Sequence, residues 1–213
     1  MDNYYALIAA GGQGTRLWPL SRVATPKQLL PLIDDHSMFQ TSIKRIESIF
    51  PPQNIFIVSG EEYAKQLSAD APEIPKENFI IEPYGKNTAP ALGLAFAYIQ
   101  SRDPDATVAI LTADHHIANK MKFCRVLEAA YDIAQDGKIV TLGISPSYPS
   151  TGFGYIQAGH SIAEVDGFTV YQSERFTEKP DIVKATQFLA SGKYSWNSGM
   201  FIWKVADAMR DLE

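Results

Sequence analysis

The sequence of 213 residues predicts an α/β protein in which helices flank a mostly parallel sheet. Two observations carry this prediction. Short segments that are apolar on both faces recur through the first two thirds of the chain, as in the buried strands of parallel sheets. Between these segments, apolar residues recur at the spacing of helices that pack against a sheet. Strands that alternate with helices in this order favour parallel pairing through crossover connections.

The predicted strands of this first part are short and apolar, and they span residues 4–10, 54–59, 78–81, 106–111 and 139–144. The predicted helices follow from apolar residues at helical spacing, namely Phe39, Ile43, Ile46 and Phe50, then Leu92, Ala95, Phe96 and Ile99, and then Phe123, Leu127, Ala130, Tyr131 and Ala134. Each predicted helix stands between two predicted strands, as a crossover connection requires.

After residue 144 the sequence becomes rich in turn-forming residues and the predicted strands become shorter. Asp181 follows Pro180 and begins a helix that runs to residue 190, because aspartate is a favourable N-cap. A last helix begins near residue 206. No segment has the composition of a linker between independent domains, so one domain is expected over residues 1–213. The strands predicted in this part span residues 154–158, 162–165, 168–175 and 197–203.

Composition and charge limit the classes of function. With 19 basic and 24 acidic residues the net charge is -5, which argues against nucleic acid or an anionic membrane as the main partner. The single cysteine, Cys124, excludes a disulfide framework and a multi-thiolate metal site, and it is expected to fill the core. No targeting signal begins the chain and no apolar run approaches about 18 residues. We therefore expect a cytoplasmic protein without a membrane segment.

A glycine-rich segment follows the first predicted strand directly, with Gly11, Gly12 and Gly14 before Arg16. Ligands of α/β sheets bind beyond the carboxyl ends of strands, and glycines there let backbone N–H groups approach anionic oxygens. Arg16 and, further along, Lys27 supply cations that can bind phosphate. An ordinary turn at the end of the strand is the alternative.

Two familiar phosphate-binding loops do not fit this segment. A P-loop would need a Gly-Lys-Ser or Gly-Lys-Thr sequence after the first glycines, and the chain has none there. A dinucleotide fingerprint that starts at Gly12 would need its third glycine at the position of Leu17. Pro19 and Pro26 also prevent the immediate helix that such a fingerprint requires. The segment is therefore predicted to run extended.

Polar residues close two further predicted strands. Glu82 ends one of them, and Asn87 or Thr88 is a sound N-cap for a helix with Pro90 in its first turn. The functional alternative is that Asn87 reads the edge of a nucleotide base. Asp114 ends a buried strand, where an unpaired carboxylate is costly, so a cation is expected beside it. Mg²⁺ that bridges to a substrate phosphate is a natural partner.

Two histidines come directly after this aspartate, His115 and His116. They suggest a zinc site, but adjacent histidines point apart and no further His or Cys lies at zinc-ligand spacing. We expect one of them to donate a hydrogen bond near Asp114 and the other to help cap the next segment of the chain.

Polar residues in the later part of the chain can bind a phosphorylated sugar. Glu178 can accept hydroxyl groups, Lys179 can hold a phosphate, and Asn197 can both donate and accept. Glycines alternate with aromatic residues around Tyr155, and strand packing explains this pattern equally well.

Taken together, these segments resemble the nucleotide-sugar pyrophosphorylases, and within that family the mannose-1-phosphate guanylyltransferase (GDP-mannose pyrophosphorylase) branch. Residues 11–22 carry the resemblance together with Pro26-Lys27-Gln28, and the run from Trp18 to Arg22 is typical of that branch. The other matching segments stand in the family's order, at residues 82–83, 87–91, 113–115, 152–156, 178–180 and 196–201.

The resemblance implies a Rossmann-like fold of the nucleotide-diphospho-sugar transferase type. It implies a nucleotide-binding half at residues 1–144 and the start of a sugar-phosphate-binding half at residues 145–213. The implied reaction transfers GMP from GTP to mannose 1-phosphate, with Mg²⁺ as cofactor, and gives GDP-mannose and pyrophosphate. The resemblance also leaves a homodimer open.

The resemblance assigns roles to individual residues. It implies Arg16, Lys27, Asp114 and Lys179 as catalytic residues, with Asp114 as the metal ligand. The implied nucleotide-binding residues are Ala9, Ala10, Gly11, Gly12, Gly14, Thr15, Arg16, Lys27, Glu82, Asn87, Thr88 and Ala113. The implied sugar-phosphate-binding residues are Gly154, Tyr155, Glu178, Lys179 and Asn197.

The sequence departs from the family pattern at three points. Thr112 stands where proline is usual, and Lys86 replaces a usual arginine. The chain also ends at Glu213, whereas the family's domain continues to a second metal-binding carboxylate. The domain is therefore expected to be incomplete and, by itself, weakly active or inactive. Two alternatives are a catalytically inactive nucleotide-sugar-binding regulatory subunit and a pyrophosphorylase for another hexose 1-phosphate.

Overall fold

A computed structural model describes residues 1–11, 17–22, 25–83 and 88–212, without the side chains of Thr88 and Leu212. The chain forms two compact units. Residues 1–139 and 202–213 make the first unit, and residues 140–201 make the second. Each unit is described by itself.

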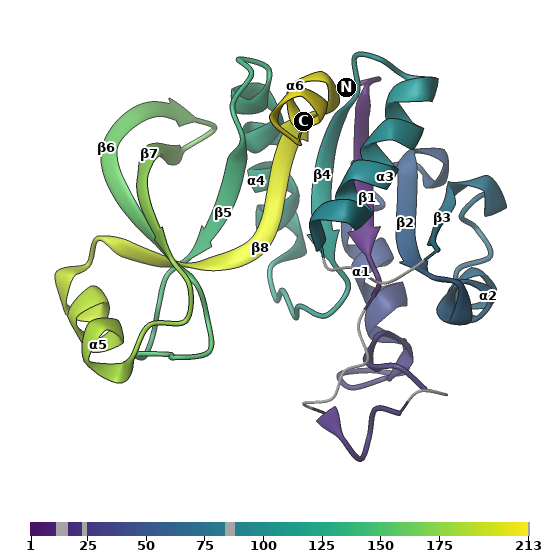
Figure 1. Ribbon diagram of the computed structural model, residues 1–213, viewed down its shortest axis with the longest axis horizontal. Coiled ribbons are helices and arrows are strands. Elements are labelled where there is room, and N and C mark those ends of the chain that lie inside the picture. The colour runs from purple at the N-terminus through teal and green to yellow at the C-terminus, as the bar shows by residue number, and fades with distance from the viewer. Residues whose placement is uncertain (12–16, 23–24, 84–87, 213) are drawn as a thin grey trace. The chain divides into compact units, whose positions relative to one another are not determined.

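Parallel strands adjoin in the order β3-β2-β1-β4 in the first unit (Figure 1). The central strand β1 is buried on both faces, and its Ile8 pairs with Ile57 of β2 and with Leu111 of β4. Because all these strands run in one direction, their carboxyl ends lie at one edge of the sheet. The strands are β1 (Tyr4–Ala9), β2 (Ile55–Gly60), β3 (Phe79–Glu82) and β4 (Thr107–Thr112).

Helices connect and cover these strands. In Figure 1, α3 crosses in front of the strands, whereas α1 and α4 lie behind them. A capping box begins α1, because Ser37 accepts from the backbone N–H of Gln40 and the Gln40 side chain accepts from that of Ser37. The helices are α1 (Met38–Ile46), α2 (Glu61–Asp70), α3 (Thr88–Arg102), α4 (Lys120–Ala134) and α6 (Val205–Leu212), with short 3-10 turns at Lys27–Leu29, Pro52–Asn54 and Lys76–Asn78.

An aromatic cluster closes the amino-terminal end of the sheet against α4. The buried Tyr4 ring lies 4.7 Å from the ring centroids of both Phe50 and Tyr131. Its hydroxyl donates to the carbonyl oxygen of Leu127 at 2.9 Å, so the buried hydroxyl is satisfied. Cys124 is buried in the same helix, which confirms that it fills the core.

The second unit is antiparallel. Its strand β6 pairs with β7 and with β8, and β5 also pairs with β8. On one face of this sheet, Tyr155, Trp196 and Ala185 of α5 form a small core. Asp181 caps α5 by accepting from the backbone N–H of Lys184 at 2.9 Å, as the sequence predicts. The elements are β5 (Val140–Ile144), β6 (Tyr155–Val165), β7 (Phe168–Thr177), α5 (Ile182–Ser191) and β8 (Tyr194–Lys204), and the last residues of β8 belong to the first unit.

The α/β class, the mostly parallel core and the flanking helices are confirmed. The prediction is wrong in three details. Residues 154–158 and 162–165 are predicted as two strands, but one strand, β6, runs through both. Its pairing with β7 is irregular after Gln157, where the register shifts. The helix predicted to reach Phe50 ends at Ile46 and continues as a turn. The sequence analysis also missed α2, in which only Tyr63, Ala64 and Leu67 are buried.

Within the described ranges, no helix combines the length and the apolar character needed to cross a membrane.

Asn78 joins three parts of the first unit. Its side chain is 1% exposed, and its amide nitrogen donates to the carbonyl oxygens of Gln53 and Ile55, both at 2.9 Å. Its amide oxygen accepts from Nη1 of Arg102 at 3.0 Å. The start of β2, the start of β3 and the end of α3 are therefore held by one buried amide.

We expect Asn78→Ala to lower the free energy of unfolding by about 2 kcal/mol, because buried carbonyl oxygens lose their donor. Urea denaturation followed by circular dichroism measures this change. The control is Lys76→Ala, in the same turn and at its start, which should change the free energy by less than about 0.5 kcal/mol. Equal losses in the two variants would contradict the role of Asn78.

Candidate active site at the carboxyl ends of the parallel strands

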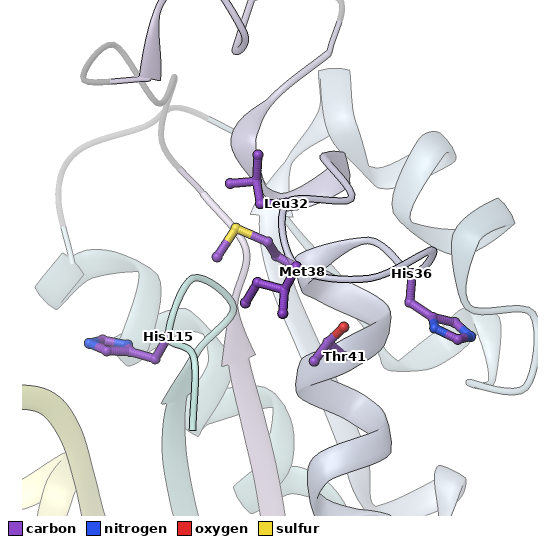
Figure 2. Close-up of a pocket in the computed structure, with 6 residues that line it drawn as sticks. Leu32, His36, Met38, Thr41 and His115 are labelled. Carbon is purple, nitrogen blue, oxygen red and sulfur yellow. The ribbon is translucent and has the colours of Figure 1, made fainter. Parts of the chain in front are cut away.

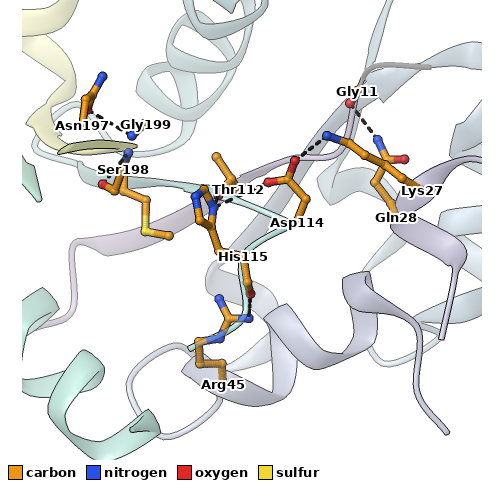
Figure 3. A network of polar contacts seen from close by, with 11 residues as sticks. Gly11, Lys27, Gln28, Arg45, Thr112, Asp114, His115, Asn197, Ser198 and Gly199 are labelled. Atoms are coloured by element: carbon orange, nitrogen blue, oxygen red, sulfur yellow. Dashed lines mark hydrogen bonds and ion pairs between the residues drawn. The ribbon is translucent and has the colours of Figure 1, made fainter. Parts of the chain in front are cut away.

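The end of β1 presents open backbone at the carboxyl edge of the sheet. Ala10 is buried and its N–H donates to the carbonyl oxygen of Val58 at 3.0 Å, which prolongs the pairing beyond Ala9. Gly11 comes next, and a Cβ placed on it would meet no atom of the described residues within 4 Å. Its carbonyl oxygen accepts from Nε2 of the buried Gln28 at 2.7 Å (Figure 3). The backbone is thus fixed on one side and accessible on the other.

Asp114 lies at the same edge, just beyond β4. Ala9 pairs with Thr112, so the segments that continue from β1 and β4 start side by side. The Lys27 ammonium donates to Oδ2 of Asp114 (Figure 3), and the two side chains are 25% and 34% exposed. The expectation that Asp114 has a cationic partner is confirmed. The partner in this structure is a lysine from the 3-10 turn Lys27–Leu29.

The pair keeps Asp114 ionised. Burial raises the pKa of its carboxyl group, but the hydrogen bond from Lys27 and the charge of Lys27 outweigh this effect. The net pKa of Asp114 therefore lies below its ordinary value, and the group is a carboxylate at neutral pH. Carboxylate oxygens are the ligands that a hard divalent cation prefers.

His115 is a neutral neighbour of this carboxylate. Burial lowers its pKa, and the charges of Arg45 and Lys27 lower it further, whereas Asp114 opposes them at 3.5 Å. Its Nδ1 forms a hydrogen bond with Oγ1 of Thr112, and its carbonyl oxygen accepts from the guanidinium of Arg45 (Figure 3). The turn that carries Asp114 is therefore held by its own strand end and by α1.

Metal-binding side chains do not cluster further in the described part of the chain. No group of three or more His, Cys, Asp or Glu residues lies close enough there to share an ion. His116 is exposed, and no described contact joins it to Asp114. The donor set is a single carboxylate, which suits a cation that takes its other ligands from substrate phosphates and water.

Several of the other predicted nucleotide-binding residues lie within the described ranges. Glu82 ends β3 opposite Gly60 of β2, at the same edge of the sheet, and Ala113 is buried beside Asp114. Thr88 is the first residue of α3 and Pro90 the third, so Pro90 does lie in the first turn. Gly12, Gly14, Thr15, Arg16, Lys86 and Asn87 lie outside the described residues.

Sequence reasoning missed two contributors to this edge. Gln28 follows Lys27 in the motif, but no local pattern predicts its contact with Gly11, which lies 17 residues away. Arg45 interrupts the apolar repeat of α1 between Ile43 and Ile46, and it is nevertheless buried. A charged residue at a buried helix position is the signal that could have identified it.

The second unit brings a separate set of predicted residues together. Tyr155 pairs with Thr177 of β7 and with Trp196 of β8, so Gly154 lies between Glu178 and Asn197. The backbone N–H of Asn197 donates to the carbonyl oxygen of Gly154 at 2.8 Å. A Cβ on Gly154 would stand 2.7 Å from Oε2 of Glu178, so any other residue there would make that carboxylate shift from its present position.

The polar groups around Gly154 are oriented by their neighbours. Oδ1 of Asn197 accepts from the backbone N–H of Gly199 at 3.0 Å and from Oγ1 of Thr141 at 3.4 Å, and these two bonds fix the orientation of the amide. Lys179 has a left-handed backbone with φ of 41°, and its ammonium lies 2.8 Å from Oε1 of Glu178. Both of these charged side chains are about half exposed, as groups that meet a ligand must be.

The Tyr155 side chain belongs to the core rather than to this polar face. It is fully buried, and its hydroxyl donates to the carbonyl oxygen of Ser150 at 2.9 Å. Because side chains alternate along a strand, Tyr155 points away from the face that carries Gly154. The prediction that the backbone of Gly154 and Tyr155 orients a sugar is untested by these contacts.

A small pocket lies beside the first site. Figure 2 shows that it opens between the segment before α1, the start of α1 and the turn that holds His115. Its lining residues are Leu32, Ile33, His36, Met38, Thr41 and His115. No sequence motif pointed to this pocket.

A parallel sheet with open glycine backbone and charged side chains at its carboxyl edge is the arrangement in which α/β proteins bind their ligands. The sequence profile of the nucleotidyl transferase family matches residues 5–213. The chain therefore belongs to the nucleotidyl transferase family.

Named relatives narrow the comparison. The chain is 39% identical over 213 residues to the mannose-1-phosphate guanylyltransferase ManC of Salmonella typhimurium, and 38% identical over 213 residues to a mannose-1-phosphate guanylyltransferase of Escherichia coli K12. Each match covers 98% of this chain and 44% of the relative, so the chain spans less than half the length of these relatives. A solved structure described as mannose-1-phosphate geranyltransferase from Thermus thermophilus is similar with a TM-score of 0.86 and 29% identity. That match covers 99% of this chain and 63% of the other.

The acid dependence of stability should report on Asp114. Its folded-state pKa is lowered, so its stabilising effect is present above about pH 4 and is lost as the pH falls through that lowered pKa. We expect the wild type to lose about 0.5 kcal/mol more between pH 6 and pH 2.5 than Asp114→Asn, a small value because the pair is partly exposed. Urea denaturation at a series of pH values measures the difference.

The matched control for that series is Glu47→Gln, which removes the carboxylate of the exposed Lys120–Glu47 pair at 2.8 Å. It should behave as the wild type does. An acid dependence of Asp114→Asn that equals that of the wild type would show that Lys27 does not stabilise the ionised carboxylate.

Proposed function

We propose that the protein transfers GMP from GTP to mannose 1-phosphate, which gives GDP-mannose and pyrophosphate. The observation that carries the chemistry is the Lys27–Asp114 pair beside the open backbone of Gly11. This edge offers a cation, a carboxylate and free backbone to a polyphosphate. The choice of guanine and mannose rests on the similarity to mannose-1-phosphate guanylyltransferases over 98% of this chain.

The reaction needs positioning and charge neutralisation more than proton transfer. A phosphate oxygen of the sugar phosphate attacks the α-phosphorus in line, and pyrophosphate leaves. The attacking oxygen is already anionic, so no general base is required. Lys27 and Arg16 hold the triphosphate, and their charges offset the negative charge that crowds around the reacting phosphorus.

A divalent cation, Mg²⁺, belongs to this proposal. The ionised carboxylate of Asp114 fits it, since Mg²⁺ is usually bound by one or two carboxylates together with substrate phosphates. When bound, the ion neutralises and orients the phosphates. The role of Asp114 is to hold the ion, which requires that its oxygen turn from Lys27 toward the ion while Lys27 turns toward a phosphate.

The polar face of the second unit is proposed to bind mannose 1-phosphate. Glu178 accepts sugar hydroxyls, the amide nitrogen of Asn197 donates to one, and Lys179 holds the phosphate. The backbone of Gly154 and Tyr155 orients the ring. The geometry that supports this assignment is the convergence of Glu178 and Asn197 on Gly154.

The remaining assignments stay predictions of the same proposal. Asn87 and the backbone of residues 9–11 read guanine, and Gly12, Gly14 and Thr15 contribute to the phosphate-binding segment. Glu82, Thr88 and Ala113 complete the set that contacts the nucleotide. The reaction takes place in the cytoplasm, where GTP and sugar phosphates are available. A homodimer and the division of roles between residues 1–144 and 145–213 likewise remain predictions.

No observation favours a second function. An inactive regulatory subunit would have no use for both members of the Lys27–Asp114 pair and for Lys179, and all of these residues are present.

The function is tested in the full-length protein by calorimetric titration with the four nucleoside triphosphates and by a coupled pyrophosphate-release assay. With Mg²⁺ we expect GTP and mannose 1-phosphate to give the highest kcat/KM. Equal affinities for all triphosphates, or preference for a pyrimidine, would contradict the guanine assignment. A higher kcat/KM with glucose 1-phosphate would contradict the mannose assignment, and GTP binding without any turnover would identify a regulatory subunit instead.

Gly154→Ala should weaken the binding of mannose 1-phosphate and leave the binding of GTP nearly unchanged. The added Cβ would meet Oε2 of Glu178 at 2.7 Å and Cζ of Phe176 at 2.8 Å, so these side chains must move. We expect the KM for mannose 1-phosphate to rise about tenfold, which is about 1.4 kcal/mol, while the Kd for GTP stays within about twofold.

Gly152→Ala is the matched control for this substitution. Its Cβ would lie 3.7 Å from Oγ of Ser150, an ordinary contact, and the KM should stay near the wild-type value. If Gly154→Ala raises the Kd for GTP as much as the KM for the sugar phosphate, Gly154 does not act on the sugar side.

A further inference from the structure

Arg45 is a buried cation that the reaction described above does not use. It lies in the last turn of α1 and is 6% exposed. Its guanidinium stands 5.8 Å from the ring centroid of Phe123 in α4, and its carbonyl oxygen accepts from Sγ of Cys124 at 3.3 Å. In the described ranges no carboxylate forms an ion pair with it. Burial accordingly lowers its pKa.

The guanidinium has one described hydrogen-bond acceptor, and that acceptor belongs to the active-site turn. Its Nη2 donates to the backbone carbonyl oxygen of His115 (Figure 3). His115 is the residue directly after Asp114, so this bond joins the rigid end of α1 to the segment that carries the carboxylate. A charge-assisted bond to a backbone oxygen is stronger than a neutral one and fixes the chain direction there.

Three contacts hold this turn, and they differ in how they respond to a ligand. The bond between Thr112 and His115 is local to the turn. The Lys27–Asp114 pair would be broken by the ligand, because Lys27 would bind the polyphosphate and Asp114 would bind the cation. Arg45 is only 6% exposed and donates to a backbone oxygen, and the proposed function assigns neither group to a ligand, so this bond persists when the other partners exchange.

We propose that Arg45 is a positioning residue, which holds the Asp114–His115 turn and so aims the Asp114 carboxylate at the polyphosphate. Its buried charge also adds to the positive potential beneath the phosphates, where a low dielectric makes charges effective. This inference rests on the proposed function, because it assigns Arg45 to the same site.

The alternative is that Arg45 serves folding alone. The two roles differ in their expected effects on stability and on turnover. Arg45→Met removes the described donor to the His115 carbonyl oxygen, so a loss of stability is expected in either case. If Arg45 serves the site, Arg45→Met should also lower turnover per folded molecule. If it serves folding, stability should fall and turnover per folded molecule should not.

The test compares Arg45→Met, Arg45→Lys and Arg45→Gln in the full-length protein, by urea denaturation and by pyrophosphate release. We expect Arg45→Met to lower kcat about tenfold or more with the KM for GTP within about threefold, since the reacting geometry rather than substrate affinity changes. Arg45→Lys keeps the charge and should retain more kcat than Arg45→Gln, which keeps only a donor.

Arg102→Met is the matched control. Arg102 also lies over an aromatic ring, 4.6 Å from the centroid of Tyr98, and it donates to the side-chain oxygen of Asn78 at the opposite end of the strands. It should lose stability and keep kcat. A kcat of Arg45→Met within about twofold of the wild type overturns the proposal.

Equal kcat values in Arg45→Lys and Arg45→Gln would also overturn the proposal that Arg45 is a positioning residue. This comparison replaces the one with Arg45→Met if that variant fails to fold. Absence of nucleotidyl transfer in the wild type would instead overturn the proposed function. Activity of the wild type with another nucleotide or sugar phosphate leaves the comparison valid with that pair of substrates.

Discussion

The parallel pairing of β1 with β4 is the constraint on which the proposed nucleotide site depends. Both strands are buried on both faces, so a slip by one residue would turn every side chain into packing on the opposite face, where different neighbours surround it. In this register Ala9 lies beside Thr112. Gly11 and Asp114 each stand two residues beyond those positions, and the sheet thereby brings open backbone and a carboxylate to one edge without any specific contact between them.

In the second unit, strands that pair in antiparallel fashion also bring polar groups together. One face is filled by Tyr155, Trp196 and α5, and the alternation of side chains turns their neighbours to the other face. Gly154 then acts as the point where Glu178 and Asn197 approach from the two adjacent strands. The glycine matters here because the Glu178 carboxylate stands close to it, and its backbone is not left-handed.

The sequence predicted what local patterns encode and missed what long-range contacts decide. The buried strands, the α5 cap and the position of Asp114 at a strand end follow from apolar runs and cap residues. The polar helix α2 was missed because its apolar residues are few. The partners within the site were hidden for a different reason, since Lys27 and Asp114 are 87 residues apart and Arg45 and His115 are 70 apart. Only the paired sheet makes them neighbours.

Lys27 and Arg45 differ in their exposure to water, and this difference explains the different roles proposed for them. The Lys27–Asp114 pair is partly open to water, so breaking it costs about 1 kcal/mol or less, and a polyphosphate with its cation can replace it readily. Without a ligand the two charges satisfy each other, which keeps an ionised carboxylate at a half-buried position. Arg45 is nearly inaccessible, and its bond to His115 cannot be exchanged for one to a ligand. In the proposed function, the exchangeable Lys27 is the cation that binds the ligand, and the buried Arg45 is the cation that fixes the geometry required for in-line attack.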